Sequence, residues 1–279
     1  RQMCIRDRSN GDVSMICRNY HKNSLQFLEQ MIWELEKKQD KPKIKALQDQ
    51  LNVSKLVSSL LLNRGIDTFE KAKKFFRPSL SDLHDPFLMQ DMQKAVDRIQ
   101  QAIKENEKIL VFGDYDVDGT TSVALVSSFL NKHLSDTVLT YIPDRYTEGY
   151  GISMKSIEFA ESKNVKLIIA LDCGIQAIDK VEYAKGKNID FIICDHHTPP
   201  SEIPKAIAVL NPLREDCSYP YKSLCGCGIG FKLIQGLNGN ALDHLEEYLD
   251  IVALAIAADI VELTGENRTL CYYLSLIHI

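Results

Sequence analysis

The sequence lacks any hydrophobic run long enough to cross a membrane. The longest apolar stretch covers about ten residues near position 251 and ends at Asp259, whereas a transmembrane helix needs roughly 18. A secretory signal is also missing, because residues 1–20 mix Arg, Asp and Asn with few apolar positions. We therefore expect a cytoplasmic protein with no membrane partner.

An excess of positive charge is lacking too. The chain has 33 Lys and Arg residues against 38 Asp and Glu residues, which gives a formal net charge of −5. This balance argues against a broadly basic nucleic-acid clamp. It does not exclude nucleic acid as a partner, because bound metal ions can present positive charge to phosphates.

The eight cysteines include no pair with the C-x₂-C spacing of common zinc sites. Cys173 and Cys194 lie in or beside strongly apolar segments, which predicts reduced core thiols. The cluster Cys217, Cys225 and Cys227 leaves two interpretations open. One is a structural zinc site; the other, which we favour, is a tight glycine-rich turn built from small side chains.

The first third of the chain is predicted to be helical. Apolar residues at Leu25, Leu28, Ile32 and Leu35 recur at helical spacing. We expect a helical region with a proline-containing connector over residues 17–90. Residues 1–16 and 274–279 resemble translated vector sequence, so we expect non-native or disordered ends there.

Short apolar runs alternate with helical patterns over residues 91–270. This alternation predicts an α/β fold, a mainly parallel sheet with helices on both faces. The expected strands are 108–112, 137–142, 165–171, 190–194 and 206–210, and the expected helices are 91–105, 120–134, 153–162, 175–187 and much of 230–258.

Three aspartates follow the first of these strands in the segment GDYDVDG. Asp114, Asp116 and Asp118 occupy alternate positions, so in an extended segment they would point to one side. A surface loop or a helix cap would explain one or two of them. Three carboxylates on one face favour a hard divalent cation.

Further polar groups follow two later strands. Asp172 ends the third strand, and Asp195, His196 and His197 end the fourth. Ligands bind at this carboxyl edge in open α/β sheets. A lone Asp there is often only a cap, but three strand ends with metal-type ligands predict a site. Asp259, near the end of an apolar helix, is either a further ligand or a solvent-facing residue.

Several carboxylates and an imidazole are suited to a two-metal centre. Two ions about 3.5–4 Å apart can activate a water and stabilise a phosphoryl group. Asp172, on a central strand, is placed to bridge them. Mixed oxygen and nitrogen ligands favour Mn²⁺ over Mg²⁺. This pattern indicates a phosphate ester or anhydride as substrate and does not specify it further.

The ordered segments DYDVDG, LDCG, DHH and AADIVELTGENR, within residues 80–270, resemble the motifs of the DHH phosphoesterase superfamily. The resemblance implies a site with two metal ions. By position, His197 would contact the scissile phosphate or the departing oxygen, Asp195 would orient the histidines, and Asp114 would be a ligand or a support. The implied metal ligands are Asp116, Asp118, Asp172 (bridging), His196 and Asp259.

Within this superfamily, GDYDVDGTTS, IPDRYTEGYGIS and LCGCGIGFKL resemble the RecJ-like exonucleases. That resemblance implies 5′→3′ digestion of single-stranded DNA in repair and recombination, with single-strand-binding protein and a helicase as partners. Arg145 would then meet the substrate backbone or its 5′ phosphate. Alternatively, Arg145 is a loop cation paired with Glu148.

RecJ-like enzymes continue into a DHH-associated domain and an OB-fold, and we expect neither in this sequence. We therefore expect the chain to bind Mn²⁺ but to degrade DNA weakly or not at all. One alternative function is a DHH phosphodiesterase or pyrophosphatase acting on oligoribonucleotides, cyclic dinucleotides or other small substrates. A non-catalytic DHH scaffold is disfavoured, because such relatives lose ligand carboxylates that this sequence retains.

Overall fold

The computed structural model describes residues 40–133 and 137–277 of the 279-residue chain. The chain divides into two compact units, one ending at Asp67 and the other beginning at Thr68. Residues 1–16 and the expected start of the helical region at Leu25 lie outside the described residues. The side chains of residues 274–279 do as well.

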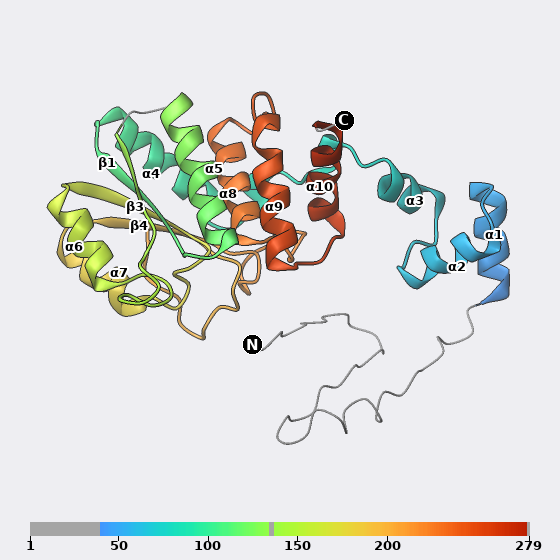
Figure 1. Cartoon of the computed structure of the whole chain (residues 1–279), viewed down its shortest axis with the longest axis horizontal. Coiled ribbons are helices and arrows are strands. Elements are labelled where there is room, and N and C mark those ends of the chain that lie inside the picture. Colours follow the sequence, from blue (N-terminus) through green and yellow to red (C-terminus); the bar gives the residue numbers. More distant parts are fainter. Residues whose placement is uncertain (1–39, 134–136, 278–279) are drawn as a thin grey trace, which may run out of the picture. The chain divides into compact units, whose positions relative to one another are not determined.

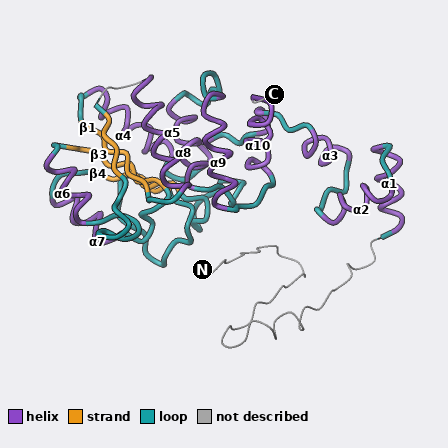
Figure 2. Tube along the Cα trace, viewed as in Figure 1, coloured by secondary structure: helices purple, strands orange, loops and turns teal. Residues whose placement is uncertain are grey.

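Two short helices form the described part of the first unit, α1 (Lys41–Leu51) and α2 (Lys55–Asn63) (Figure 2). Ser54 caps α2, because its hydroxyl oxygen accepts a hydrogen bond from the Val57 N–H at 3.3 Å. The buried apolar side chains of this unit include Ile44, Leu47 and Leu61. The predicted helical character is confirmed for this part of the region.

The second unit contains a five-stranded sheet in which all neighbouring strands run parallel. The strand order is β2-β1-β3-β4-β5. The direction of connection reverses at β1, because β2 lies on one side of it and β3 on the other. The strands are β1 (Lys108–Gly113), β2 (Val138–Tyr141), β3 (Val165–Leu171), β4 (Asp190–Cys194) and β5 (Ala208–Leu210).

Side chains of the central strands alternate between two hydrophobic cores. On β3, Leu167 and Ile169 join one core, whereas Ile168 and Ala170 join the other. Figure 1 shows the helices that cover each face. The first core lies under α4 (Met92–Lys104), α5 (Val117–His133), α8 (Gly226–Leu237) and α9 (Leu249–Asp259), and the second under α6 (Met154–Ser162) and α7 (Ile178–Gly186). The predicted α/β fold, with helices on both faces of a parallel sheet, is confirmed.

The remaining elements flank this three-layer core. Arg268 connects two of them, because its guanidinium lies 3.6 Å from the ring centroid of Phe75 and its Nε donates to the Phe75 carbonyl. The elements are α3 (Phe69–Phe76), α10 (Gly265–Ile277) and three short 3₁₀ turns, η2 (Leu80–Asp82), η3 (Pro86–Leu88) and η4 (Glu246–Tyr248).

None of the described helices is both long and apolar enough to span a membrane. The apolar helix α9, which contains the longest hydrophobic run, has 11 residues.

Candidate metal centre

The candidate site lies at the carboxyl edge of the sheet, where β1, β3 and β4 end side by side. Asp114 follows β1, Asp172 follows β3 and Asp195 follows β4. The reversal of strand order beside β1 leaves room at this edge, which is where open α/β sheets bind ligands. The strand-end residues singled out in the sequence are therefore brought together.

The expected extended conformation of the three-aspartate segment is wrong. Helix α5 already begins at Val117, because Asp116 caps it by accepting the Gly119 N–H at 2.9 Å. Asp118 therefore lies on the first helical turn. It is buried, whereas Asp116 is exposed, so these carboxylates do not share the face of a strand.

Asp114 is buried beneath this turn. A Cβ on Gly119 would lie 2.5 Å from the Asp114 carbonyl oxygen, so only glycine allows the turn to close. The Asp114 Oδ1 accepts the Gly151 N–H at 3.3 Å, and its buried Oδ2 has no hydrogen-bond partner among the described residues. Burial raises the pKa of Asp114 above its usual value.

The N-terminus of α8 holds Asp118. The Gly226 N–H donates to Asp118 Oδ2 at 2.6 Å, and the Cys227 N–H donates to Oδ1 at 2.8 Å. A helix N-terminus favours negative charge there. A Cβ on Gly226 would lie 2.5 Å from the Cβ of Asp172, so the small residues of this segment allow α8 to approach the ligands closely.

The cysteines near α8 serve packing and capping. Cys225 and Cys227 are buried, and Cys225 Sγ accepts the Gly228 N–H at 3.4 Å. The candidate metal groups within the described residues contain no cysteine, so the zinc interpretation finds no support there. Cys173 and Cys194 are buried free thiols, as predicted.

Asp172 is a buried carboxylate at the centre of the site. Its backbone adopts a left-handed conformation, with φ of 60°, which Asp tolerates better than most residues. Its Oδ1 is buried and accepts no hydrogen bond from any described residue. Burial, followed by the negative charges of Asp118 and Asp116, raises the pKa of Asp172 to about 11. A bound cation would reverse this effect.

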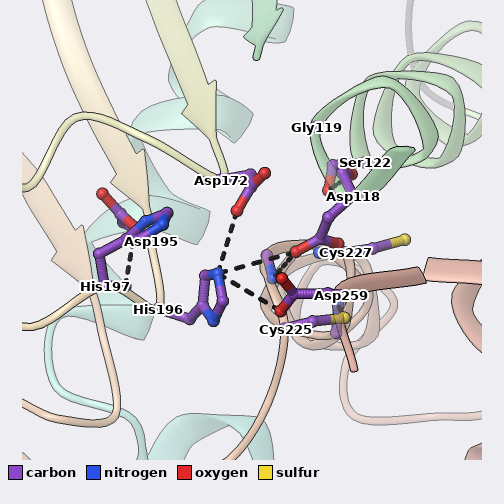
Figure 3. Close-up of polar contacts among 12 residues, drawn as sticks. Asp118, Gly119, Ser122, Asp172, Asp195, His196, His197, Cys225, Cys227 and Asp259 are labelled. Carbon is purple, nitrogen blue, oxygen red and sulfur yellow. Dashed lines mark hydrogen bonds and ion pairs between the residues drawn. The ribbon is translucent and has the colours of Figure 1, made fainter. Parts of the chain in front are cut away.

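His196 lies between three carboxylates, as Figure 3 shows. Its Nε2 lies 3.2 Å from Asp172 Oδ1, 3.7 Å from Asp259 Oδ2 and 3.9 Å from Asp118 Oδ2. Among the residues that the structure describes, two sets of groups could each hold a metal ion, and both use His196. One set is Asp118, His196 and Asp259, and the other is Asp172, His196 and His197.

His197 turns toward Asp195 instead of the carboxylate cluster (Figure 3). Its Nδ1 lies 2.7 Å from Asp195 Oδ1, and Asp195 Oδ2 accepts the Ile175 N–H at 2.8 Å. The hydrogen bond to Asp195 raises the pKa of His197. Burial alone would raise the pKa of Asp195, but the hydrogen bond and the charge of His197 outweigh it and lower that pKa.

Asp259 is the last residue of α9 and reaches the site from outside the sheet. A carboxylate at a helix C-terminus is unfavourable without a partner. Burial raises the pKa of Asp259, and nearby Asp118 adds to this effect, whereas His196 opposes it. Asp259 is an exposed residue at the end of α9, but its Oδ2 lies 3.7 Å from His196 Nε2, which places it among the potential ligands.

Arg145 lies beside the three-aspartate segment. Its side chain is exposed, and its guanidinium lies 5.0 Å from the centroid of the Tyr115 ring, a cation–π contact. The alternative pairing with Glu148 is not found among the described residues. Glu148 instead accepts hydrogen bonds from the hydroxyls of Tyr141 and Ser153.

Sequence reasoning missed Tyr150. Its hydroxyl lies 3.3 Å from His197 Nε2 and 3.4 Å from the carbonyl oxygen of Asp172. Gly149 and Gly151 on either side have positive φ angles, and this G-Y-G pattern was the available signal. Next to it is a pocket of about 270 Å³, lined by residues that include Tyr150, Ile152, Ile175, Gln176, Lys180 and His197.

A protein-family model matches this chain. The match agrees with the order of the candidate ligands along the sequence and with their position at one sheet edge. The model of the DHH family N-terminal domain matches residues 108–256. The chain belongs to the DHH family. The match covers the strands, α8 and most of α9, and it confirms the superfamily resemblance of the sequence motifs.

Several similar curated proteins are named single-stranded-DNA-specific exonuclease RecJ. The chain is 43% identical to the Bacillus subtilis protein over 85% of its length, and 37% identical to the Escherichia coli protein over 65%. It spans only 30% and 33% of those two proteins. The similarity to RecJ inferred from the sequence is confirmed.

Comparison with solved structures also shows similarity to RecJ. An exonuclease RecJ bound to manganese matches 70% of this chain and 49% of its own, with a TM-score of 0.62 and 30% identity. A Thermus thermophilus RecJ in complex with Mn²⁺ matches 84% of this chain and 33% of its own, with a TM-score of 0.69 and 26% identity. A second Thermus structure holds Mg²⁺.

Proposed function

We propose that this chain carries the metal-binding part of an exonuclease that degrades single-stranded DNA from the 5′ end, in repair and recombination. The observation that carries the proposal is the pair of ligand groups that share His196 at the carboxyl edge of the sheet. The names of the similar proteins support the substrate class.

The donor set fits two divalent cations, Mn²⁺ or Mg²⁺. Among the described residues, the buried Oδ2 of Asp114 has no hydrogen-bond partner, and the nearest basic group to the buried Oδ1 of Asp172 is the ring nitrogen of His196 at 3.2 Å, so both oxygens are available to a cation. We assign Asp172 as the bridging ligand, and we keep Asp114 as a ligand or a support. The other proposed ligands are Asp116, Asp118, His196 and Asp259.

When bound, such ions activate a water molecule and neutralise charge on the phosphoryl group. His197 then supplies the remaining proton chemistry. Asp195 fixes the orientation of its ring through Nδ1, which leaves Nε2 free to contact the scissile phosphate or protonate the departing oxygen. The Tyr150 hydroxyl lies 3.3 Å from this nitrogen and is therefore close to the group that would contact the phosphate.

Features beside the metal groups support a single-stranded substrate. Arg145 is placed to bind the substrate backbone or a 5′ phosphate. Tyr146 is 94% exposed and Tyr150 is 54% exposed, so both rings can stack on unpaired bases without regard to sequence. Single-strand-binding protein and a helicase as partners, and a cytoplasmic location, stay predictions.

To test this, the chain is incubated with end-labelled single strands, duplexes and dinucleotides in the presence of Mn²⁺, and the released products are measured. We expect slow digestion by this chain, with mononucleotides released from the 5′ end of single strands and even less product from duplex. His197→Ala should release less product, and the exposed Asp97→Asn, the matched control, should release as much product as the unchanged chain. Release from the 3′ end would contradict the proposed polarity. Dinucleotides cleaved as fast as long strands would favour the small-substrate alternative.

A further inference from the structure

A lysine in the middle of α8 is completely buried. The side chain of Lys232 is 0% exposed, and its Nζ lies 2.6 Å from Oε1 of Glu266, which is 1% exposed in the first turn of α10. Buried ion pairs seldom add stability over apolar residues of similar volume. The presence of this ion pair in the core therefore needs an explanation other than stability. One explanation is that the pair holds the helices that it joins in a single arrangement.

Directional hydrogen bonds surround this pair. Lys232 Nζ also donates to the His84 carbonyl and to Gln235 Oε1, both at 3.0 Å. Glu266 accepts the His84 N–H at 2.9 Å and the Tyr219 hydroxyl at 2.6 Å. The pair thus connects α8 and α10 to the η2–η3 connector and to the segment before α8. These hydrogen bonds restrict relative movement of the connected elements.

The helices that contain Lys232 and Glu266 are both close to candidate metal ligands. The first N–H groups of α8 hold Asp118. Helix α10 begins shortly after Asp259, at the end of a short loop. Asn267, adjacent to Glu266, donates to the Glu262 carbonyl in that loop at 2.9 Å and to the Ser223 carbonyl before α8 at 2.6 Å.

We propose that Lys232 and Glu266 form a positioning pair, which sets the distance between Asp118 and Asp259 and so the affinity of one metal position. The inference rests on the proposed metal site. Asp118 and Asp259 share one candidate ligand group with His196, whereas the group of Asp172, His196 and His197 contains no residue from α9 or α10. Without a rigid anchor, repulsion between carboxylates would move Asp259 out of the cluster.

The experiment titrates Mn²⁺ into the chain by calorimetry, before and after the paired substitution Lys232→Met with Glu266→Gln. Removing both charges leaves no unpaired ion in the core. We expect a folded variant with one unchanged Mn²⁺ position. The second position should bind about 10-fold to 100-fold more weakly, as is typical when outer partners of a metal site are lost.

Arg98→Met is the matched control. Arg98 pairs with Glu107 and Asp190 at the opposite edge of the sheet, each at 2.7 Å, so its loss should lower the melting temperature without changing either Mn²⁺ affinity. If the paired variant does not fold, Tyr219→Phe removes one hydrogen bond to Glu266. It should then weaken the same position by a smaller factor.

Three results would overturn the inference. Two unchanged Mn²⁺ positions in the folded paired variant, or in folded Tyr219→Phe, would show that the pair has no effect on the site. Equal weakening of both positions would show a general effect on the fold. Fewer than two Mn²⁺ positions in the unchanged chain would instead contradict the proposed two-ion site, and the positioning role with it.

Discussion

At the scale of single residues, Asp172 and His197 show how one sheet edge holds carboxylates and imidazoles with different tasks. Asp172 is buried, has a left-handed backbone and lies near other carboxylates. Burial and the neighbouring carboxylates disfavour the charged form of Asp172 in the metal-free fold. His197 is half-exposed and holds a single strong contact to Asp195. The environment of Asp172 therefore favours binding of a cation, and that of His197 favours proton transfer.

We predict that Asp172→Asn abolishes tight Mn²⁺ binding while the metal-free fold becomes no less stable. The pKa of Asp172 is raised, so its stabilising contribution is complete only below the unfolded value of 3.8 and is lost as pH rises toward about 11. Asn removes that cost at pH 7. Melting curves with and without Mn²⁺ test this.

The Mn²⁺ affinity of Asp172→Asn should fall by more than about 100-fold, since outer partners alone account for roughly 10-fold to 100-fold. The exposed Asp97→Asn is the control and should leave both measurements unchanged. Unaltered Mn²⁺ binding by Asp172→Asn would refute the bridging assignment.

We also predict that Asp195→Asn lowers the pKa of His197. The hydrogen bond that His197 donates to Asp195 is the largest cause of the raised pKa of this imidazole, and the charge of Asp195 adds to the effect. The protonated fraction of His197 should therefore decline at a lower pH in the variant. Nuclear magnetic resonance titration of the ring in the metal-free chain measures this, and an unchanged or higher midpoint would contradict the proposed role of Asp195.

At the scale of elements, α8 lies against candidate ligands from three separate segments. Its N–H groups bind Asp118, and its first glycine lies against Asp172. Its buried lysine contacts α10, which follows Asp259 in the chain. The sequence LCGCGIGFKL therefore owes its small residues to the close approach of a helix to two carboxylates.

We predict that Gly226→Ala weakens Mn²⁺ binding and destabilises the fold by about 1–3 kcal/mol, because the added methyl group overpacks a tight contact. The new Cβ would lie 2.5–2.8 Å from atoms of Asp172. Calorimetry and chemical denaturation measure the two effects.

Gly186→Ala in α7 is the matched control, since a Cβ there meets no atom within 4 Å. It should be neutral or stabilising by up to about 1 kcal/mol, because alanine favours helices over glycine. An equal loss of Mn²⁺ affinity in both variants would contradict the role given to Gly226.

At the scale of the whole molecule, the ligand groups lie between Asp114 and Asp259, all within the second unit. The chain spans about a third of the RecJ proteins that it resembles. Metal binding therefore depends on residues that the chain contains, whereas its action on DNA is a proposal.

We predict that Mn²⁺ stabilises this chain against unfolding and that EDTA reverses the effect. Mn²⁺ at 100 times its Kd should add about 2.7 kcal/mol for each independent position, because it binds the folded state preferentially. Differential scanning calorimetry at several Mn²⁺ concentrations tests this. A melting temperature that does not respond to Mn²⁺ would argue against a preformed site.

The sequence alone determined the fold class and most of the candidate ligands. Apolar runs of strand length between amphipathic segments indicate a parallel sheet wherever they occur, because both faces must be buried. Asp172, His196 and Asp259 could be found for a similar reason, since each follows an apolar element that has a predictable end.

Tertiary structure decided the relations between segments that are distant along the chain. The strand order, the hydrogen bonds from α8 to Asp118, the Tyr150 contact and the Lys232–Glu266 pair all depend on packing between such segments. Even the local expectation for Asp118 was wrong, because the cap at Asp116 starts α5 early. Periodicity shows which residues face a core, but only packing shows which residues meet there.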